Sequence, residues 1–297
     1  MQADRYYRHS GRFSPIAVAK ALGLGLLVSV PMAFVYSYIL VYLPIIGVIT
    51  FLLTAGFAGV VGYAVGAVMH AGKVRNNMAA MTTAVLVGLF ALWAAWVTWV
   101  YAILHRGDAD VGLLDLVLQP AGLWQVITII NEKGAWSFKG STPTGGLLWA
   151  MWGLEASLIV GIVVVVARAA VSSPFCEGCD RWCEEHKAIA MLGPIRKDAL
   201  VPRLEQGDYG VLRELRDVSG SSFTQLDLHQ CSQCLTTVAL SATAVTFTVK
   251  KGKQQREDKA LLAHLLLSPA DLSTVKGILA EGPGSDVARV QVPIAAG

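Results

Sequence analysis

Charged residues are scarce in this chain of 297 residues. Only 15% of its residues are Asp, Glu, Lys or Arg, against roughly 25% in ordinary soluble proteins. The scarcity lies in residues 1–171, which carry 10 Lys or Arg and 6 Asp or Glu, whereas residues 172–297 carry 14 and 15. The small positive net charge therefore comes from the first part alone. Because the second part is slightly acidic, the basic overall pI does not indicate nucleic-acid binding. The basic residues of the first part lie beside apolar segments, where membrane topology explains them better.

The sequence also lacks every catalytic signature that we considered. It has no Walker-type phosphate loop, no Gly-x-Ser-x-Gly motif, no His-Glu-x-x-His motif and no dinucleotide fingerprint. Cysteine is absent before position 176. We therefore expect no enzyme, and we expect any thiol chemistry to belong to the second part of the chain.

Long apolar runs fill the first part. Crossing a bilayer takes about 20 helical residues, and four runs meet that length. We expect an α-helical membrane domain over residues 1–171, with spans at about 17–42, 44–69, 79–104 and 147–169. The first run follows a basic tail and is too long for a cleaved signal peptide, so we interpret it as an uncleaved signal-anchor.

The distribution of Lys and Arg predicts the orientation of these spans. Arg5, Arg8 and Arg12 precede the first span, Lys73 and Arg75 lie between the second and third, and a further Arg closes the fourth. Basic residues favour the cytoplasmic side. The sequence thus predicts a multi-pass protein of a bacterial inner membrane or plasma membrane, with the N-terminus and residues 172–297 in the cytoplasm.

Residues 105–146 would then form an outer loop. Two apolar runs within it are separated by Pro120, and Trp124 and Trp136 suit the headgroup region of a bilayer. We expect one or two helices that lie on the outer leaflet, with a re-entrant segment as the alternative.

Small residues form a row on the second span. Ala58, Gly62 and Gly66 recur every four residues, a spacing that lets two helices approach closely in lipid. The row predicts either packing against another span of the same chain, which we favour, or a homo-oligomer.

Glu155 is the one acidic residue inside a predicted span. An ionisable group in a membrane is costly and marks a candidate functional residue. No other Asp, Glu, Lys, Arg or His lies well within the other spans. Glu155 therefore either contributes to transport or forms a hydrogen bond between helices, and we favour the second interpretation.

Two Cys-x-x-Cys knuckles follow the last span. Cys176 and Cys179 form the first knuckle, and Cys231 and Cys234 form the second. Two-residue spacing lets both sulfurs of a knuckle reach one metal ion, and four thiolates complete a tetrahedral zinc site. Cytoplasmic thiols stay reduced, which favours metal over disulfides. We expect these four residues to bind a structural Zn²⁺.

The rest of the second domain predicts a mixture of strands and helices. Residues 223–229 and 236–249 read as strands, and the second changes its alternation near Thr243, which indicates a bulge. A helical stretch at 208–217 would be inserted between the knuckles. Residues 258–267 and 270–280 read as two helices at the end of the domain, the later one opened by Ser268. The four basic residues at 250, 251, 253 and 256 suit an exposed hairpin end.

The knuckle pair resembles a zinc ribbon or a rubredoxin-like site, and the resemblance covers only the two motifs and the strands beside the second one. It implies a small cytosolic α+β domain at 172–297. The 51 residues between the knuckles are more than twice the usual number. Cys183 and His186 are possible alternative metal ligands, because on a short helix they would face the same side as the first knuckle. The simpler interpretation of Cys183 is that it is a small buried residue without a role in metal binding.

The function that we expect from these features is that of an interaction or assembly module. The zinc domain would bind a cytosolic or membrane protein while the spans hold it in the lipid bilayer. Two other classes stay open: a transporter or channel component that uses Glu155, and a membrane-anchored thiol redox protein that uses Cys183 with the knuckles.

Overall fold

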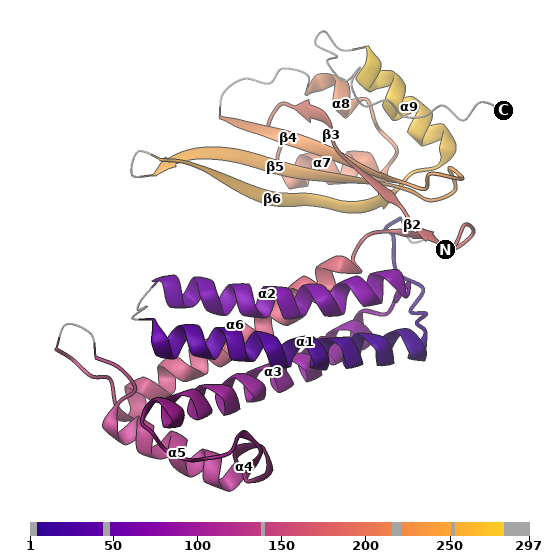
Figure 1. Cartoon of the computed structure of the whole chain (residues 1–297). Coiled ribbons are helices and arrows are strands. Elements are labelled where there is room, and N and C mark those ends of the chain that lie inside the picture. Colours follow the sequence, from indigo (N-terminus) through magenta and orange to yellow (C-terminus); the bar gives the residue numbers. More distant parts are fainter. Residues whose placement is uncertain (1–4, 44–47, 138–139, 216–220, 251–252, 282–297) are drawn as a thin grey trace. The chain divides into compact units, whose positions relative to one another are not determined.

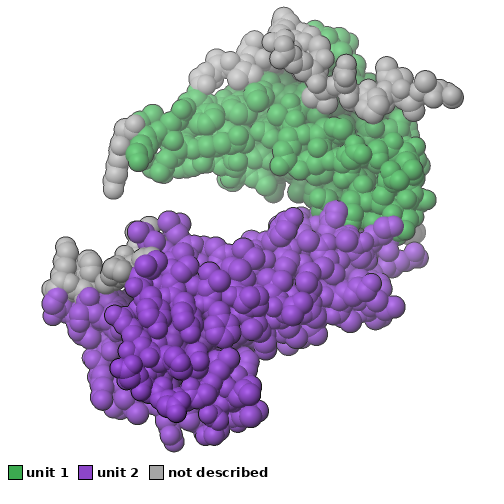
Figure 2. Space-filling view, viewed as in Figure 1, with its two compact units in different colours: residues 1–9, 173–297 green, residues 10–172 purple. Residues whose placement is uncertain are grey.

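A computed structural model describes residues 5–43, 48–137, 140–215, 221–250 and 253–281. The chain divides into two compact units, shown in different colours in Figure 2. One unit contains residues 10–172, and the other joins residues 5–9 to residues 173–281. Residues 44–47, where the second predicted span begins, lie outside the described residues, as do Lys139 and Lys251.

Four helices of the first unit are long and apolar enough to cross a membrane. They confirm the four predicted runs: α1 (Pro15–Tyr42), α2 (Val48–Ala71), α3 (Asn77–Arg106) and α6 (Gly145–Ala170). Helices α1, α3 and α6 extend slightly beyond the predicted bounds, and α2 ends two residues later than predicted. Helix α1 packs against α2 and α3, and α6 packs against the same two helices (Figure 1).

Capping residues determine where two of these helices begin. The hydroxyl of Ser14 accepts a hydrogen bond from the backbone N–H of Ala17, and Pro15 occupies the first turn of α1. The amide oxygen of Asn76 accepts from the N–H of Ala79 at the start of α3. Each cap satisfies a backbone donor that has no partner within the helix.

Two shorter helices follow α3, as the sequence predicts for this loop. They are α4 (Leu113–Leu118) and α5 (Pro120–Lys133), and Pro120 opens the second of them. Leu116, Leu123 and Ile127 of these helices are buried in one cluster with residues of α3 and α6. The loop is therefore packed onto the helix bundle, whereas Trp124 stays 59% exposed.

The second unit is built on an antiparallel sheet. Its strand order is β3 (Glu184–Leu192), β4 (Ser222–Gln230), β5 (Val238–Lys250) and β6 (Lys253–Leu266). A separate two-stranded hairpin joins β1 (Phe175–Cys176) to β2 (Arg181–Trp182). Helices α8 and α9 lie on one side of the sheet (Figure 1). One hydrophobic core contains leucines from the sheet and from all three helices of this unit. These helices are α7 (Lys197–Glu205), α8 (Val211–Glu214) and α9 (Pro269–Ala280).

The prediction of a helix at residues 258–267 is wrong, because this segment belongs to β6. Its alanines and leucines favour a helix in isolation. In the fold, however, the segment pairs with β5 along its whole length, and tertiary pairing overrides a weak local preference. The register shifts on both sides of Ala242, which confirms the irregularity predicted near Thr243.

Other predictions in this unit are closer to the structure. Helix α9 confirms the helix predicted at 270–280, and Ser268 caps it in a capping box with Asp271. The insert between the knuckles is larger than one helix, since it contains β2, β3, α7, α8 and β4. Helix α8 covers only four residues of the predicted stretch at 208–217, and residues 216–220 lie outside the described part.

Residues 5–9 of the N-terminal tail pack with the second unit. The domain boundary predicted from sequence differs, because it places these residues in the membrane domain. The carbonyl of Arg5 accepts from the N–H of Leu266 at 2.8 Å, and the N–H of Tyr7 donates to the carbonyl of His264 at 2.9 Å. The hydroxyl of Tyr6 donates to Glu205 at 2.5 Å. The tail thus covers part of the otherwise open edge of β6.

The row of small residues on α2 packs against α6 of the same chain. A Cβ added at Gly62 would lie 3.0 Å from the backbone of Val163, and one added at Gly66 would lie 2.8 Å from Ala170. A Cβ at Gly59 would meet nothing within 4 Å. The glycines at 62 and 66 therefore permit a close approach of two helices within one chain.

We predict that Gly66→Leu destabilises the helix bundle, whereas Gly59→Leu does not. Both changes improve helix propensity equally, but only the first forces side-chain atoms into the backbone of α6, at a cost of about 1–3 kcal/mol. Thermal unfolding of the purified chain in detergent measures the difference. Equal unfolding temperatures for the two variants would contradict the close packing.

Candidate metal centre

The two knuckles lie at the ends of strands. Cys176 ends β1, and Cys179 lies in the turn that leads to β2. Cys231 directly follows β4, and Cys234 lies in the turn before β5. The N–H of Cys231 donates to the carbonyl of Thr237 at 3.1 Å, which closes the second turn. Pairing of β4 with β5 therefore fixes one knuckle, and the β1–β2 hairpin fixes the other.

The structure brings the four predicted sulfurs together. All four lie within 4.8 Å of one another, although 51 residues separate the knuckles. Zinc binds thiolates at about 2.3 Å, which places tetrahedral sulfurs about 3.8 Å apart. Two sulfur pairs are somewhat closer, at 3.5 Å for Cys176 with Cys234 and 3.1 Å for Cys179 with Cys234. The donor set and its spacing thus fit one metal ion.

Burial divides the four cysteines into two inner and two outer ligands. Cys176 and Cys231 are buried, with exposures of 0% and 1%, whereas Cys179 and Cys234 are partly exposed. The rings of Phe175 and Trp182 meet edge-to-face at 5.1 Å beside the first knuckle. A metal ion held here would have protein on its inner side and two thiolates towards solvent.

Hydrogen bonds favour the thiolate form at two of the four positions. Burial opposes ionisation of Cys176, but hydrogen bonds, the largest of them from Thr237, lower its pKa to about 6. A hydrogen bond at 2.9 Å with the hydroxyl of Thr236 lowers the pKa of Cys234. Metal ligation needs thiolates, so these threonines prepare the cluster for a cation.

Cys179 has the opposite tendency in this arrangement. Its thiol donates to the sulfur of Cys234, and this hydrogen bond raises the pKa of Cys179 to about 12. Without a metal ion, this arrangement favours the protonated form of Cys179. A bound metal ion would replace this proton, because it binds both sulfurs as thiolates.

Cys183 and His186 lie outside the four-sulfur group. The short helix expected for them is absent: Cys183 lies between β2 and β3, and His186 is on β3, paired with Leu228. The sulfur of Cys183 is 3.8 Å from the carbonyl of Thr237. Burial, together with the other cysteines, raises the pKa of Cys183 to about 12. Cys183 is thus a buried thiol beside the cluster.

Glu155 has a partner that the sequence analysis did not identify. The hydroxyl of Tyr36 on α1 donates to a carboxyl oxygen of Glu155 on α6. The hydroxyls of Tyr36 and Thr54 are 2.9 Å apart, which extends the hydrogen bonds to α2. The sequence offers no charged partner for Glu155 within the other spans, and a tyrosine is neutral. Tyr36 is nevertheless a polar residue within the first predicted span, and that polarity was the available signal.

Comparison of the chain with protein-family models, with curated proteins and with solved structures found no match. The four-sulfur cluster is the group of metal-ligating side chains found among the described residues.

We predict that Cys231→Ser removes the metal and that Cys183→Ser does not. Both changes replace a buried sulfur by oxygen, but only Cys231 belongs to the cluster. Because metal binding contributes about 10–16 kcal/mol to the folding of small zinc domains, Cys231→Ser should also abolish hydrogen-exchange protection in β4 and β5.

Metal content of the purified full chain and hydrogen exchange by mass spectrometry check this prediction. Cys183→Ser serves as the matched control and should keep both the metal and the protection. Loss of metal in both variants would show that Cys183 is a ligand.

Proposed function

We propose that this chain is a multi-pass membrane protein whose cysteine domain holds one structural Zn²⁺ and acts as a protein-interaction or assembly module. The observation that carries the proposal is the convergence of Cys176, Cys179, Cys231 and Cys234 within 4.8 Å. Zinc would join the β1–β2 hairpin to the β4–β5 turn, as in a zinc ribbon with a large insert.

Four features favour structural zinc over redox or catalytic chemistry. Four thiolates fill a tetrahedral site and leave no open position for a substrate. The fifth cysteine is buried and held as a thiol, as its raised pKa indicates, whereas reactive cysteines are exposed and have lowered pKa values. The usual ligand runs of iron–sulfur proteins are absent from the sequence. The sequence also lacks the catalytic motifs considered above.

The charge distribution of the second unit supports a protein partner over nucleic acid. Lys250 forms an ion pair with Glu257 at 2.7 Å, and Arg256 forms one with Asp258 at 2.7 Å. These basic residues lie on the β5–β6 hairpin, where the sequence predicted an exposed end. These ion pairs offset the charges of Lys250 and Arg256. Residues 172–297 as a whole carry 14 Lys or Arg against 15 Asp or Glu, so the domain has no excess of positive charge to attract phosphates.

The helices and the basic residues support the proposed placement in the membrane. Four helices of sufficient length and hydropathy supply the spans. Lys and Arg lie before the first, between the second and third, and at the end of the fourth, which favours a cytoplasmic cysteine domain. We assign the protein to a bacterial inner membrane or plasma membrane on this basis, with reduced thiols available for zinc.

We predict that a soluble protein partner binds the full chain only when the metal cluster is intact. Affinity capture from detergent-solubilised membranes, with quantitative mass spectrometry, would compare the wild type, Cys231→Ser and Cys183→Ser. The partner should be enriched with the wild type and with Cys183→Ser, and lost with Cys231→Ser, while all three chains remain in the membrane fraction.

Two results would contradict the proposed function. One is that no protein is enriched with the wild type over an unrelated four-span control. The other is that the same proteins are enriched with Cys231→Ser, which would mean that the metal-bound fold of the domain does not present the binding surface.

A further inference from the structure

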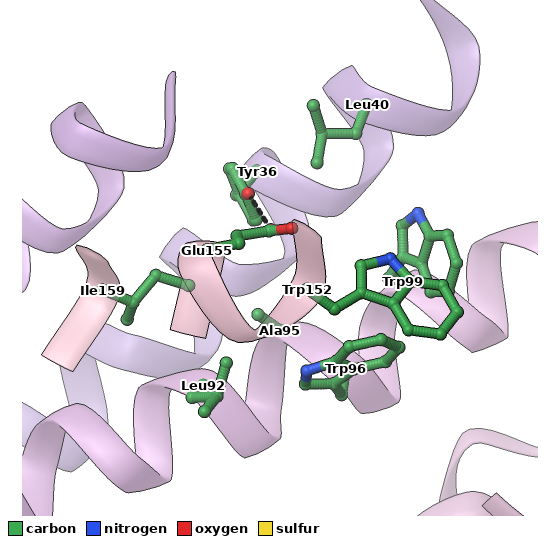
Figure 3. Close-up of a pocket in the computed structure, with 9 residues that line it drawn as sticks. All are labelled: Tyr36, Leu40, Leu92, Ala95, Trp96, Trp99, Trp152, Glu155 and Ile159. Carbon is green, nitrogen blue, oxygen red and sulfur yellow. Dashed lines mark hydrogen bonds between the residues drawn. The ribbon is translucent and has the colours of Figure 1, made fainter. Parts of the chain in front are cut away.

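A small cavity within the helix bundle is lined by the carboxyl group of Glu155 (Figure 3). Its walls come from α1, α3 and α6, all in the same compact unit. Its volume is about 30 Å³, which is room for a water molecule or two. The other polar groups of the lining are the hydroxyl of one tyrosine and the indole N–H groups of three tryptophans. The residues that line it are Tyr36, Leu40, Leu92, Ala95, Trp96, Trp99, Trp152, Glu155 and Ile159.

A chain of polar contacts leads from this cavity to α2. Figure 3 shows the contact between the hydroxyl of Tyr36 and the carboxyl group of Glu155. The hydroxyl of Tyr36 also lies 2.9 Å from the hydroxyl of Thr54. Thr54 in turn donates to the backbone carbonyl of Thr50 at 3.0 Å. Three contacts thus join α6 to α1 and α1 to α2.

The number of protons in this chain depends on the state of the carboxyl group. Three hydrogen bonds need three protons, and the two hydroxyl groups supply only two. The carbonyl of Thr50 can only accept, so the proton of Thr54 is used in that contact. The hydroxyl of Tyr36 then donates to Thr54, and the remaining contact takes its proton from Glu155. An ionised carboxyl group can only accept, so one of the three contacts would lack a proton.

The surroundings of the carboxyl group also favour its neutral form. The sequence has no Lys or Arg at positions 21–72, 76–105 or 140–167, which include the interiors of all four long helices. Tyr36 and Glu155 are the titratable residues in the lining of the cavity. A carboxylate in a bilayer is costly unless an opposite charge accompanies it. A protonated carboxyl group carries no charge, and it can both donate and accept hydrogen bonds.

We propose that Glu155 is a proton-binding site, which carries a proton in the folded bundle at neutral pH and exchanges it with water in the cavity. The proton moves between a water oxygen and a carboxyl oxygen, so the exchange needs no other reactant. Release of the proton leaves a carboxylate, turns the hydroxyl of Tyr36 from Thr54 to Glu155, and leaves one contact between the helices without a proton. The site is separate from the metal cluster and does not depend on the role proposed for the cysteine domain.

Infrared spectroscopy of the purified full chain in dodecyl maltoside tests this proposal, because a protonated carboxyl group has a C=O stretching band that carboxylates lack. At neutral pH the wild type should show this band, and Glu155→Gln should lose it. Glu132→Gln is the matched control. Glu132 is exposed on α5, and exposed carboxyl groups are ionised at neutral pH, so this change should leave the band in place.

A second variant, Tyr36→Phe, tests the direction of the hydrogen bond. It removes the oxygen that accepts from the carboxyl group, while the ring can still stack on Phe57, which lies 5.0 Å from it between centroids. The protonated band should therefore persist and move to higher frequency. Thermal unfolding of each variant shows whether the fold is retained. If Glu155→Gln does not fold, the shift of the band in Tyr36→Phe decides.

Transfer of the wild type to heavy water tests the exchange of the proton. The band of Glu155 should move to lower frequency as deuterium replaces the proton through the cavity. The proposal is overturned if the wild type has no protonated band, or if Glu155→Gln folds and keeps the band. It is also overturned if the band stays unchanged in heavy water, or if Tyr36→Phe folds and leaves the frequency of the band unchanged.

Discussion

Four sulfur atoms that come from segments far apart in the chain meet in the second unit. Cys176 and Cys179 are placed by a hairpin of only two residues per strand, which is too short to be stable alone. Cys231 and Cys234 are placed by the β4–β5 turn, which the sheet fixes. Four thiolates at this distance repel one another unless a cation neutralises them. A metal ion would therefore both hold the hairpin in place and allow the buried cysteines to ionise.

Much of this arrangement can be predicted from the sequence because the signals are local. The long apolar helices, the two knuckles and the Ser268 cap each depend on residues close together in the chain, and all three appear in the structure. The segment at 258–267 could not be assigned correctly, since its helix-forming residues are held as a strand by pairing with β5. The position of the Tyr6 segment was equally hidden, because Tyr6 contacts Glu205, which is 199 positions away, and Leu265 at the β6 edge, which is farther still along the chain.

The same distinction applies to the two candidate sites. Spacing alone identified the cysteine ligands, and it left Cys183 and His186 as alternatives that only the strand geometry could separate. Glu155 stood out by its charge in an apolar span, but its surroundings come from three other helices. In a bundle with so few polar groups, the hydroxyls of Tyr36 and Thr54 are the partners that a buried carboxyl group can reach, and tryptophans form the remaining wall.

The most direct test of the proposed metal site is X-ray absorption at the zinc edge of the purified full chain. We predict one zinc ion per chain with four sulfur neighbours at about 2.3 Å and no nitrogen or oxygen in the first shell. A shell of three sulfurs and one nitrogen would mean that a histidine, such as His186, takes the place of one of the four cysteines as a zinc ligand. A folded chain without zinc would contradict the central claim that a four-cysteine metal site holds this domain together.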